Sequence, residues 1–239
     1  MYCLSPTYVA HTPELQGTYG EYCVLKDEWV SLAPTSLSLT DAAAVPLVAL
    51  TAVQALDKAE SKPGQRILIT GGSGGVGHLA IQLAKTDYKL HVTAVASAKH
   101  HAWLKSLGAD EVVDYTAGVE QCLAPFMAEE KKFDAILDVI GGDMLDVATS
   151  KCLKGGGIVS EVMNRGSGSS TVVGANGSGV RFATTLVQPN GQQLAHLAQL
   201  IDGGKLKVQV AKTLPLEQAG AAQEEVLGGH AGGKIVLTI

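Results

Sequence analysis

A glycine-rich segment in the first half of the chain constrains the fold more than any other feature. Residues 71–77 read GGSGGVG and satisfy the spacing G-x-G-x-x-G at Gly72, Gly74 and Gly77. The run RILIT directly before them is typical of a buried strand, and the segment after them has the apolar spacing of a helix. Here glycine lets the backbone turn sharply beside a diphosphate, and the helix N-terminus offers free N–H groups. The pattern therefore predicts a dinucleotide-binding βαβ unit.

Short β-rich runs alternate with helical runs from Pro63 onward, which is typical of a parallel sheet with crossover helices. We expect strands at 66–70, 91–96, 111–114, 133–139, 157–162 and 180–187, and helices at 76–85, up to 107, at 119–128 and at 144–153. A Gly- and Ser-rich loop is expected at 166–179, a helix around 194–201, and strands at 207–210 and in the terminal letters KIVLTI. The sequence thus predicts an α/β fold with a Rossmann-type doubly wound parallel sheet.

Composition narrows the class of protein. Hydrophobic residues make up 46% of the 239 residues and charged residues 17%, which favours a globular chain, and the net charge of −5 disfavours nucleic acid or an anionic membrane as partner. No apolar run approaches the roughly 20 residues of a membrane span, and no signal or transit composition is present. The four cysteines lack metal-ligand spacing. We expect a soluble intracellular protein without a metal site.

The glycine segment also fits a serine-hydrolase pattern. Gly71-x-Ser73-x-Gly75 is the spacing of a nucleophile elbow, and Asp138 or Asp143 followed by His230 would complete the order of a catalytic triad. In such hydrolases several strand–helix units precede the elbow, whereas here the strand before it is the first of the series. A hydrolase using Ser73 remains a remote alternative.

The same letters also resemble the short-chain dehydrogenase pattern TGxxxGxG. That mechanism needs a YxxxK motif downstream, which supplies the tyrosine acid. The YxxxK of this chain runs from Tyr22 to Lys26 and lies upstream of the glycines. The mechanism therefore has no candidate tyrosine.

The end of the second expected strand predicts which nicotinamide cofactor binds. Sites that prefer NAD place an Asp or Glu there, about 20 residues past the glycines, to bind the ribose diol. Residues 96–100 read ASAKH instead. A carboxylate would repel a 2′-phosphate, whereas the hydroxyl of Ser97 and the ammonium of Lys99 would bind one. The sequence therefore favours NADP(H).

Four segments in order resemble the zinc-independent quinone oxidoreductase branch of the medium-chain dehydrogenase/reductase superfamily. They are DAAAVPLVALTAVQAL, GGSGGVGHLAIQLAK, LGADEVVDY and GHAGGKIVL. The resemblance runs over almost the whole chain and includes the chloroplast-envelope quinone oxidoreductase homologues. It implies hydride transfer from NADPH to a quinone or to the β-carbon of an α,β-unsaturated carbonyl compound.

The resemblance also implies site residues. It places Ser73, Gly74, Gly75 and Val76 at the diphosphate, Ser97, Lys99 and Tyr115 at the 2′-phosphate, and Thr51, Val139 and Asn164 near the nicotinamide. Two plainer interpretations stay open, that Tyr115 only caps the third strand and that Thr51 is an ordinary helix residue. No residue is assigned as a catalytic acid.

In the family that the chain resembles, a GroES-like catalytic domain comes first, and the resemblance leads us to expect that this chain starts near the end of that domain. The resemblance therefore divides the chain into a remnant of the GroES-like domain (1–40), an NADP(H)-binding Rossmann domain (41–187) and a segment returning to the catalytic domain (188–239). The segments TYGEYCVL, KVQV and KIVLTI would belong to that domain. The expected alternative function is a catalytically impaired NADP(H)-binding module. A homodimer through residues 180–187 and a cytoplasmic or plastid location are also expected.

Overall fold

The computed structural model describes residues 1–4, 17–162, 179–229 and 232–239. The chain forms two compact units, one from Thr51–Leu186 and one from Met1–Leu50 together with Val187–Ile239. All but the last residue of the loop expected at 166–179 lies outside the described residues. Among the described residues, no helix combines the length and the apolar character needed to cross a bilayer.

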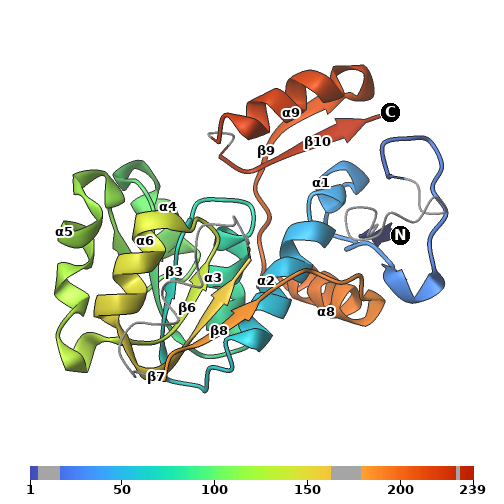
Figure 1. Ribbon diagram of the computed structural model, residues 1–239. Helices are drawn as coiled ribbons and strands as arrows, with labels where there is room; N and C mark the ends of the chain where they lie inside the picture. The colour runs from blue at the N-terminus through green and yellow to red at the C-terminus, as the bar shows by residue number, and fades with distance from the viewer. Residues whose placement is uncertain (5–16, 163–178, 230–231) are drawn as a thin grey trace. The chain divides into compact units, whose positions relative to one another are not determined.

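A six-stranded parallel sheet forms the centre of the unit Thr51–Leu186 (Figure 1). Its order is β5-β4-β3-β6-β7-β8, which is the doubly wound order of dinucleotide-binding folds. The predicted Rossmann-type sheet is therefore confirmed. The strands are β3 (Arg66–Ile69), β4 (His91–Val95), β5 (Glu111–Val113), β6 (Phe133–Asp138), β7 (Leu153–Glu161) and β8 (Arg181–Thr184).

Helices connect these strands and cover both faces of the sheet (Figure 1). They are α3 (Gly77–Thr86), α4 (His101–Ser106), α5 (Val119–Leu123) and α6 (Gly142–Val147). On one face, Leu68, Ile136 and Val159 from three neighbouring strands form a buried cluster with Leu123 of α5 and Leu145 of α6. Apolar burial of this kind supplies the main driving force for folding and makes the sheet a rigid base for the loops at its edge.

Two strand boundaries in the sheet differ from the predicted ones by more than one residue. The helix expected at 144–153 consists of α6 and a π-helical turn over Ala148–Cys152, and β7 then begins at Leu153 rather than at residue 157. The early start follows from pairing, because Leu153 lies opposite Phe133 at the start of β6. The strand expected at 180–187 ends at Thr184, opposite the last residue of β7.

The second unit is built from short elements at the two ends of the chain. They are β1 (Tyr2–Cys3), β2 (Val30–Ser31), α1 (Leu39–Ala43), the start of α2 (Pro46–Lys58), α8 (Gly191–Asp202), β9 (Val210–Pro215), α9 (Ala219–Leu227) and β10 (Lys234–Thr238). Helix α8 begins where the side chain of Asn190 accepts a hydrogen bond from the N–H of Gln193. It packs so closely on β2 that a Cβ at Gly191 would lie 2.4 Å from the carbonyl oxygen of Val30.

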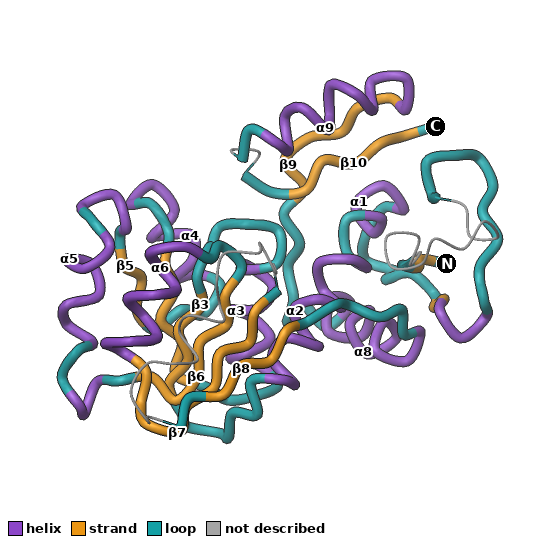
Figure 2. The backbone as a smooth tube through the Cα atoms, in the orientation of Figure 1, coloured by secondary structure: helices purple, strands orange, loops and turns teal. Residues whose placement is uncertain are grey.

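One strand of this unit is shifted from its expected position. Strand β9 begins at Val210, where the sequence placed the strand at 207–210, because parallel pairing with β10 sets Val210 opposite Lys234. Residues 18–25, the segment TYGEYCVL, contain no strand. Figure 2 shows β9 and β10 side by side with α9 between them in the chain. The division into a GroES-like remnant and a cofactor domain stays a prediction.

Candidate functional site

The carboxyl ends of β3 and β6 mark the most constrained place in the sheet. These strands are neighbours, yet the chain leaves β3 toward β4 on one side and leaves β6 toward β7 on the other. Doubly wound sheets bind ligands at such a switch point, outside the carboxyl ends of the strands. The glycine-rich loop between β3 and α3 and the turn after β6 both lie at this edge. It is therefore the candidate site.

Two glycines of the loop, Gly71 and Gly77, have no room for a side chain. Gly71 has a φ of +61°, and a Cβ there would lie 2.6 Å from Cγ2 of Val139, so the loop after β3 contacts the turn after β6. A Cβ at Gly77 would lie 2.2 Å from the carbonyl oxygen of Gly71 and 2.8 Å from Cα of Gly72. Helix α3 can approach the loop this closely only because residue 77 is glycine.

The loop presents hydrogen-bond donors at the N-terminus of a ten-residue helix. The N–H of Gly74 donates to the carbonyl of Gly71, and the N–H of His78 donates to the carbonyl of Gly74. Within the described part of the chain, the N–H groups of Gly75 and Val76 donate to no other backbone group. No side chain caps α3, and its first turn carries no acidic residue. Such an end binds anions, so the loop can hold a diphosphate.

A polar network that the sequence analysis did not assign holds the switch point together. The carboxylate of Asp138, which is fully buried at the end of β6, accepts hydrogen bonds from the hydroxyl of Thr70 (2.6 Å) and from the N–H of Gly141 (2.8 Å). The hydroxyl of Thr70 in turn accepts from the N–H of Val139 at 3.0 Å. Asp138 therefore fixes the turn that contains Val139, a role unlike that in the hydrolase alternative. The other triad candidate, His230, lies outside the described residues.

At this edge of the sheet, burial and a neighbouring negative charge raise the pKa of one carboxyl group. Burial, followed by the charge of neighbouring Asp138, raises the pKa of Glu161 at the end of β7. Strand pairing places Asp138 and Glu161 opposite each other. A second buried negative charge is unfavourable beside the first, so Glu161 holds its proton to higher pH than a free glutamate does.

The residues expected at the 2′-phosphate follow two neighbouring strands. Ser97 and Lys99 lie after β4 and Tyr115 lies after β5, with Lys99 and Tyr115 exposed and Ser97 half-buried. At the end of β5, the carboxylate of Asp114 accepts hydrogen bonds from the N–H and the hydroxyl of Thr116, and these bonds lower the pKa of Asp114. The sequence analysis missed Asp114, although its place at the end of the third strand was a usable signal.

Positive charge gathers on the turn after β4. Burial, followed by the positive charges of Lys99 and His101, lowers the pKa of His100. The ring of His101 lies 3.2 Å from the carbonyl oxygen of Ala96, which holds this turn against the end of the strand. The turn therefore presents a basic surface beside the sheet edge.

The three residues expected near the nicotinamide fall in different places. Val139 lies at the switch point in contact range of Gly71. Thr51 is buried in α2, within the same compact unit as the sheet. Asn164 lies outside the described residues. The structure thus brings Val139 together with the loop of Ser73, Gly74, Gly75 and Val76.

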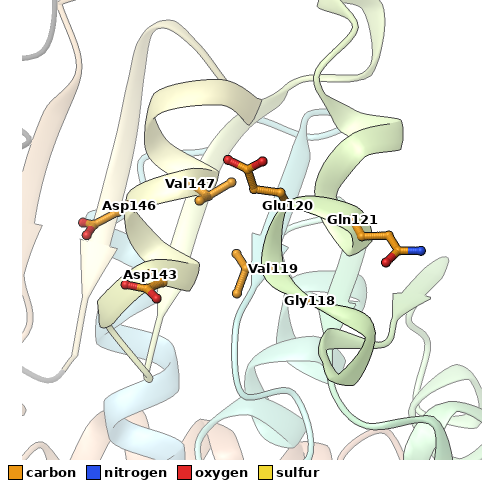
Figure 3. Close-up of a pocket in the computed structure, with 7 residues that line it drawn as sticks. All are labelled: Gly118, Val119, Glu120, Gln121, Asp143, Asp146 and Val147. Atoms are coloured by element: carbon orange, nitrogen blue, oxygen red, sulfur yellow. The ribbon is translucent and has the colours of Figure 1, made fainter.

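A pocket of about 490 Å³ lies elsewhere, between α5 and α6 (Figure 3). Its acidic lining includes Glu120 of α5 and Asp143 and Asp146 of α6. These carboxylates would repel the phosphates of a dinucleotide. The glycine-rich loop, which presents N–H donors, is the better candidate. Among the described residues, no three His, Cys, Asp or Glu side chains gather as the ligands of a metal ion would.

Comparison with known proteins identifies the family. Residues 107–237 match the family described as zinc-binding dehydrogenase. The mitochondrial NAD(P)H oxidoreductase RTN4IP1 of Mus musculus is 35% identical over 97% of this chain and 64% of its own length. The chloroplast envelope quinone oxidoreductase homolog of Arabidopsis thaliana is 31% identical over 92% of this chain and 68% of its own length. The predicted resemblance to this group is confirmed.

A solved structure agrees with these relatives. The quinone oxidoreductase from Coxiella burnetii is 35% identical and superimposes with a TM-score of 0.75 over 86% of this chain and 62% of its own. The chain spans less than two thirds of the RTN4IP1 relative's length. Sheet order, glycine loop and relatives agree that the chain belongs to the zinc-binding dehydrogenase family of the medium-chain dehydrogenase/reductase superfamily, among relatives that are quinone oxidoreductases.

Proposed function

We propose that this chain binds NADPH at the carboxyl edge of its sheet and transfers a hydride to a quinone or to the β-carbon of an α,β-unsaturated carbonyl compound. The observation that carries the proposal is the loop after β3, where Gly77 has no space for a Cβ and Gly75 and Val76 offer N–H groups at a helix N-terminus. The names of the relatives support the reaction class, since they are NAD(P)H and quinone oxidoreductases.

Two features of the turn after β4 favour NADPH over NADH. Lys99 is exposed there, and His100 and His101 lie beside it. Residues 96–100 contain no carboxylate that would repel a 2′-phosphate. A phosphate at this turn would therefore meet positive charge and a hydroxyl.

In the proposed reaction, the chain's own residues bind the cofactor and orient it. When bound, the cofactor supplies the hydride, and the protein contributes position and electrostatics. In the proposal, Gly75 and Val76 hold the diphosphate through their N–H groups and Lys99 binds the 2′-phosphate. The bonds from Thr70 and Gly141 to Asp138 keep Val139 in one place, so that the cleft wall does not move. The reduced acceptor takes its proton from water.

Calorimetry with NADPH and NADH tests the cofactor. We expect tighter binding of NADPH, and we expect Lys99→Glu to weaken NADPH binding by about tenfold or more, as loss of a charge-assisted bond to phosphate implies, with little change for NADH. The matched control is Lys105→Glu, an exposed lysine of α4 that is expected to have no effect. Tighter binding of NADH by the wild-type chain would contradict the choice of NADPH.

Steady-state assays with a small quinone and a simple enone test the reaction. Oxidation of NADPH that requires either acceptor supports the proposal. NADPH binding without turnover of either acceptor would support the alternative, an NADP(H)-binding module with impaired catalysis. Covalent labelling of Ser73 by a fluorophosphonate would instead favour a hydrolase.

The proposal extends to assembly. Strand β8 lies at one edge of the six-stranded sheet, and a second copy of the chain could extend the sheet there. We propose a homodimer through this edge, and sedimentation at several concentrations checks its mass. The cytoplasmic or plastid location stays a prediction.

A further inference from the structure

His78 lies where the glycine-rich loop enters α3. Its side chain is fully buried, and its Nδ1 lies 2.8 Å from the carbonyl oxygen of Gly74. Because a carbonyl oxygen only accepts, Nδ1 carries the proton of this hydrogen bond. Burial lowers the pKa of His78, so the ring is neutral at physiological pH and the other ring nitrogen carries no proton.

This bond determines where the next N–H group points. The N–H of His78 also donates to the carbonyl of Gly74, at 3.2 Å, so one residue holds that oxygen with two donors. In a trans peptide the C=O and the following N–H point in opposite directions. Holding the carbonyl of Gly74 against α3 therefore turns the N–H of Gly75 away from the helix, as a donor to a diphosphate must point.

The ring of His78 also contacts α4, the helix that follows the turn after β4. Its ring stacks on Trp103 of α4, with centroids 5.8 Å apart and planes 29° apart. Trp103 also contacts His100, with centroids 6.0 Å apart and planes at 59°. His100 follows Lys99 on the turn after β4. An unbroken series of contacts thus joins Gly74 in the glycine-rich loop to the turn that carries Lys99.

We propose that His78 and Trp103 are positioning residues that hold the glycine-rich loop and the turn after β4 in register, so that the diphosphate and the 2′-phosphate of one NADPH are bound together. The inference rests on the proposed function. It assigns separate effects to the two rings. His78 orients a donor to the diphosphate, which NADPH and NADH share, whereas Trp103 holds the turn that contacts the 2′-phosphate, which NADPH alone carries.

Two substitutions separate these effects when the Kd of each nucleotide is measured. His78→Phe keeps a ring for stacking but removes the donor to Gly74, so the Kd values of NADPH and NADH should both rise by about tenfold and their ratio should stay constant. Trp103→Leu removes the stack, so the Kd of NADPH should rise by about threefold to tenfold while that of NADH changes little. Trp103→Phe retains an aromatic ring and should restore most of the lost preference.

If the role of Trp103 were purely structural, Trp103→Leu would weaken the binding of NADPH and of NADH equally. That result for Trp103→Leu, with thermal unfolding showing a folded protein, would overturn the inference and leave the proposed function intact. Absence of NADPH binding by the wild-type chain would overturn the proposed function and the inference with it. The control is Trp29→Phe, which alters the other tryptophan of the chain and lies in the other unit.

Fluorescence gives a second readout in the Trp29→Phe background, where Trp103 is the remaining tryptophan. If Trp103 links the two segments, binding of NADPH should change the fluorescence emission of Trp103. His78→Phe should then raise the NADPH concentration that gives half of this change by the same factor as it raises the Kd of NADPH. An emission that does not respond to saturating NADPH would contradict a place for Trp103 beside the site.

Discussion

The two compact units of this chain differ in the contacts that stabilise each of them internally. In the unit Thr51–Leu186, neighbouring parallel strands bury whole runs of aliphatic side chains, and Ile67, Leu68 and Ile69 are completely shielded from solvent. In the unit formed by the two ends of the chain, the strands come in pairs, and large apolar side chains such as Tyr22 and Leu32 are exposed. Strand pairing with burial of aliphatic side chains, repeated from strand to strand, stabilises the first unit. Single contacts between segments far apart in the chain stabilise the second.

Polar contacts show the same contrast. The buried carboxylate of Asp138 is surrounded by donors that lie within the sheet edge. In the other unit, the exposed carboxylate of Asp202 at the end of α8 accepts hydrogen bonds from the backbone and side chains of Thr35 and Ser36, more than 160 residues away in the chain. The first network needs a correct sheet, while the second defines how the two ends of the chain meet.

The largest expected effect is in the regular unit, at Gly77. Gly77→Ala should destabilise the protein by about 1–3 kcal/mol or more, because its Cβ would meet backbone atoms that cannot move without displacing α3. Thermal unfolding measures the loss. The control in the other unit is Gly220→Ala in α9, where nothing lies within 4 Å of the new Cβ, and where alanine should stabilise the helix by about 0.5–1 kcal/mol. Equal effects at both sites would contradict the contrast.

Asp138→Asn tests the buried network. The amide loses the charge that strengthens the bonds from Thr70 and Gly141 and places donor hydrogens beside other donors. We expect a loss of about 1–3 kcal/mol in denaturant unfolding. Asp143→Asn, an exposed neighbour on α6, is the matched control and should be nearly neutral. If both variants unfold at the same denaturant concentration, the network does not stabilise the sheet edge.

Tyr2→Phe tests a single contact in the irregular unit. The buried hydroxyl of Tyr2 donates to the carbonyl of Leu194 at 2.6 Å and joins the first residues of the chain to α8. Its removal should cost about 0.5–1.5 kcal/mol. Tyr22→Phe, at an exposed tyrosine, should cost nothing measurable by the same denaturant titration. A neutral Tyr2→Phe would show that this unit does not depend on that contact.

The contrast explains which parts of the fold could be predicted. Alternating runs between residues 66 and 162 encode strands and helices locally, so the doubly wound parallel sheet and its glycine-rich loop could be predicted from the sequence. In the irregular unit, the start of β9 depends on its pairing with β10, and the letters AGAAQEEVLGG gave too weak an apolar spacing to predict α9. Where tertiary contacts decide the structure, local pattern is not enough.

The candidate site shows the same limit. Glycine spacing predicted the glycine-rich loop between a strand and a helix, and charge is the basis of the proposal that Lys99 binds the 2′-phosphate. The bond of Thr70 to Asp138 joins the ends of two neighbouring strands, and the stacking of His78 on Trp103 joins two helices. Their spacing in the chain follows no motif, so only the fold brings them together.

The smallest expected effect is a difference in pH dependence between the units. Hydrogen bonds from Ser36 and Thr35 lower the pKa of Asp202 to about 2, whereas an unfolded aspartate titrates near about 3.9. Its stabilisation is therefore complete above about pH 4 and is lost as the pH falls toward 2. The difference in Tm between the wild-type protein and Asp202→Asn should be largest near neutral pH and should vanish near pH 2.

Glu161 in the regular unit should show the opposite sign. Because burial and Asp138 raise its pKa, the folded state binds a proton that the unfolded state has released, so Glu161 favours folding below its unfolded pKa of about 4.3 and loses this advantage as the pH rises through its raised folded pKa. Glu161→Gln should therefore gain in Tm relative to the wild-type protein as the pH rises from about 4. Asp202→Asn should instead lose Tm relative to the wild-type protein as the pH rises from about 2 to about 4, and the difference should be constant above that. Parallel curves for the two variants would show that the carboxylates of the two units do not differ in the way their surroundings imply.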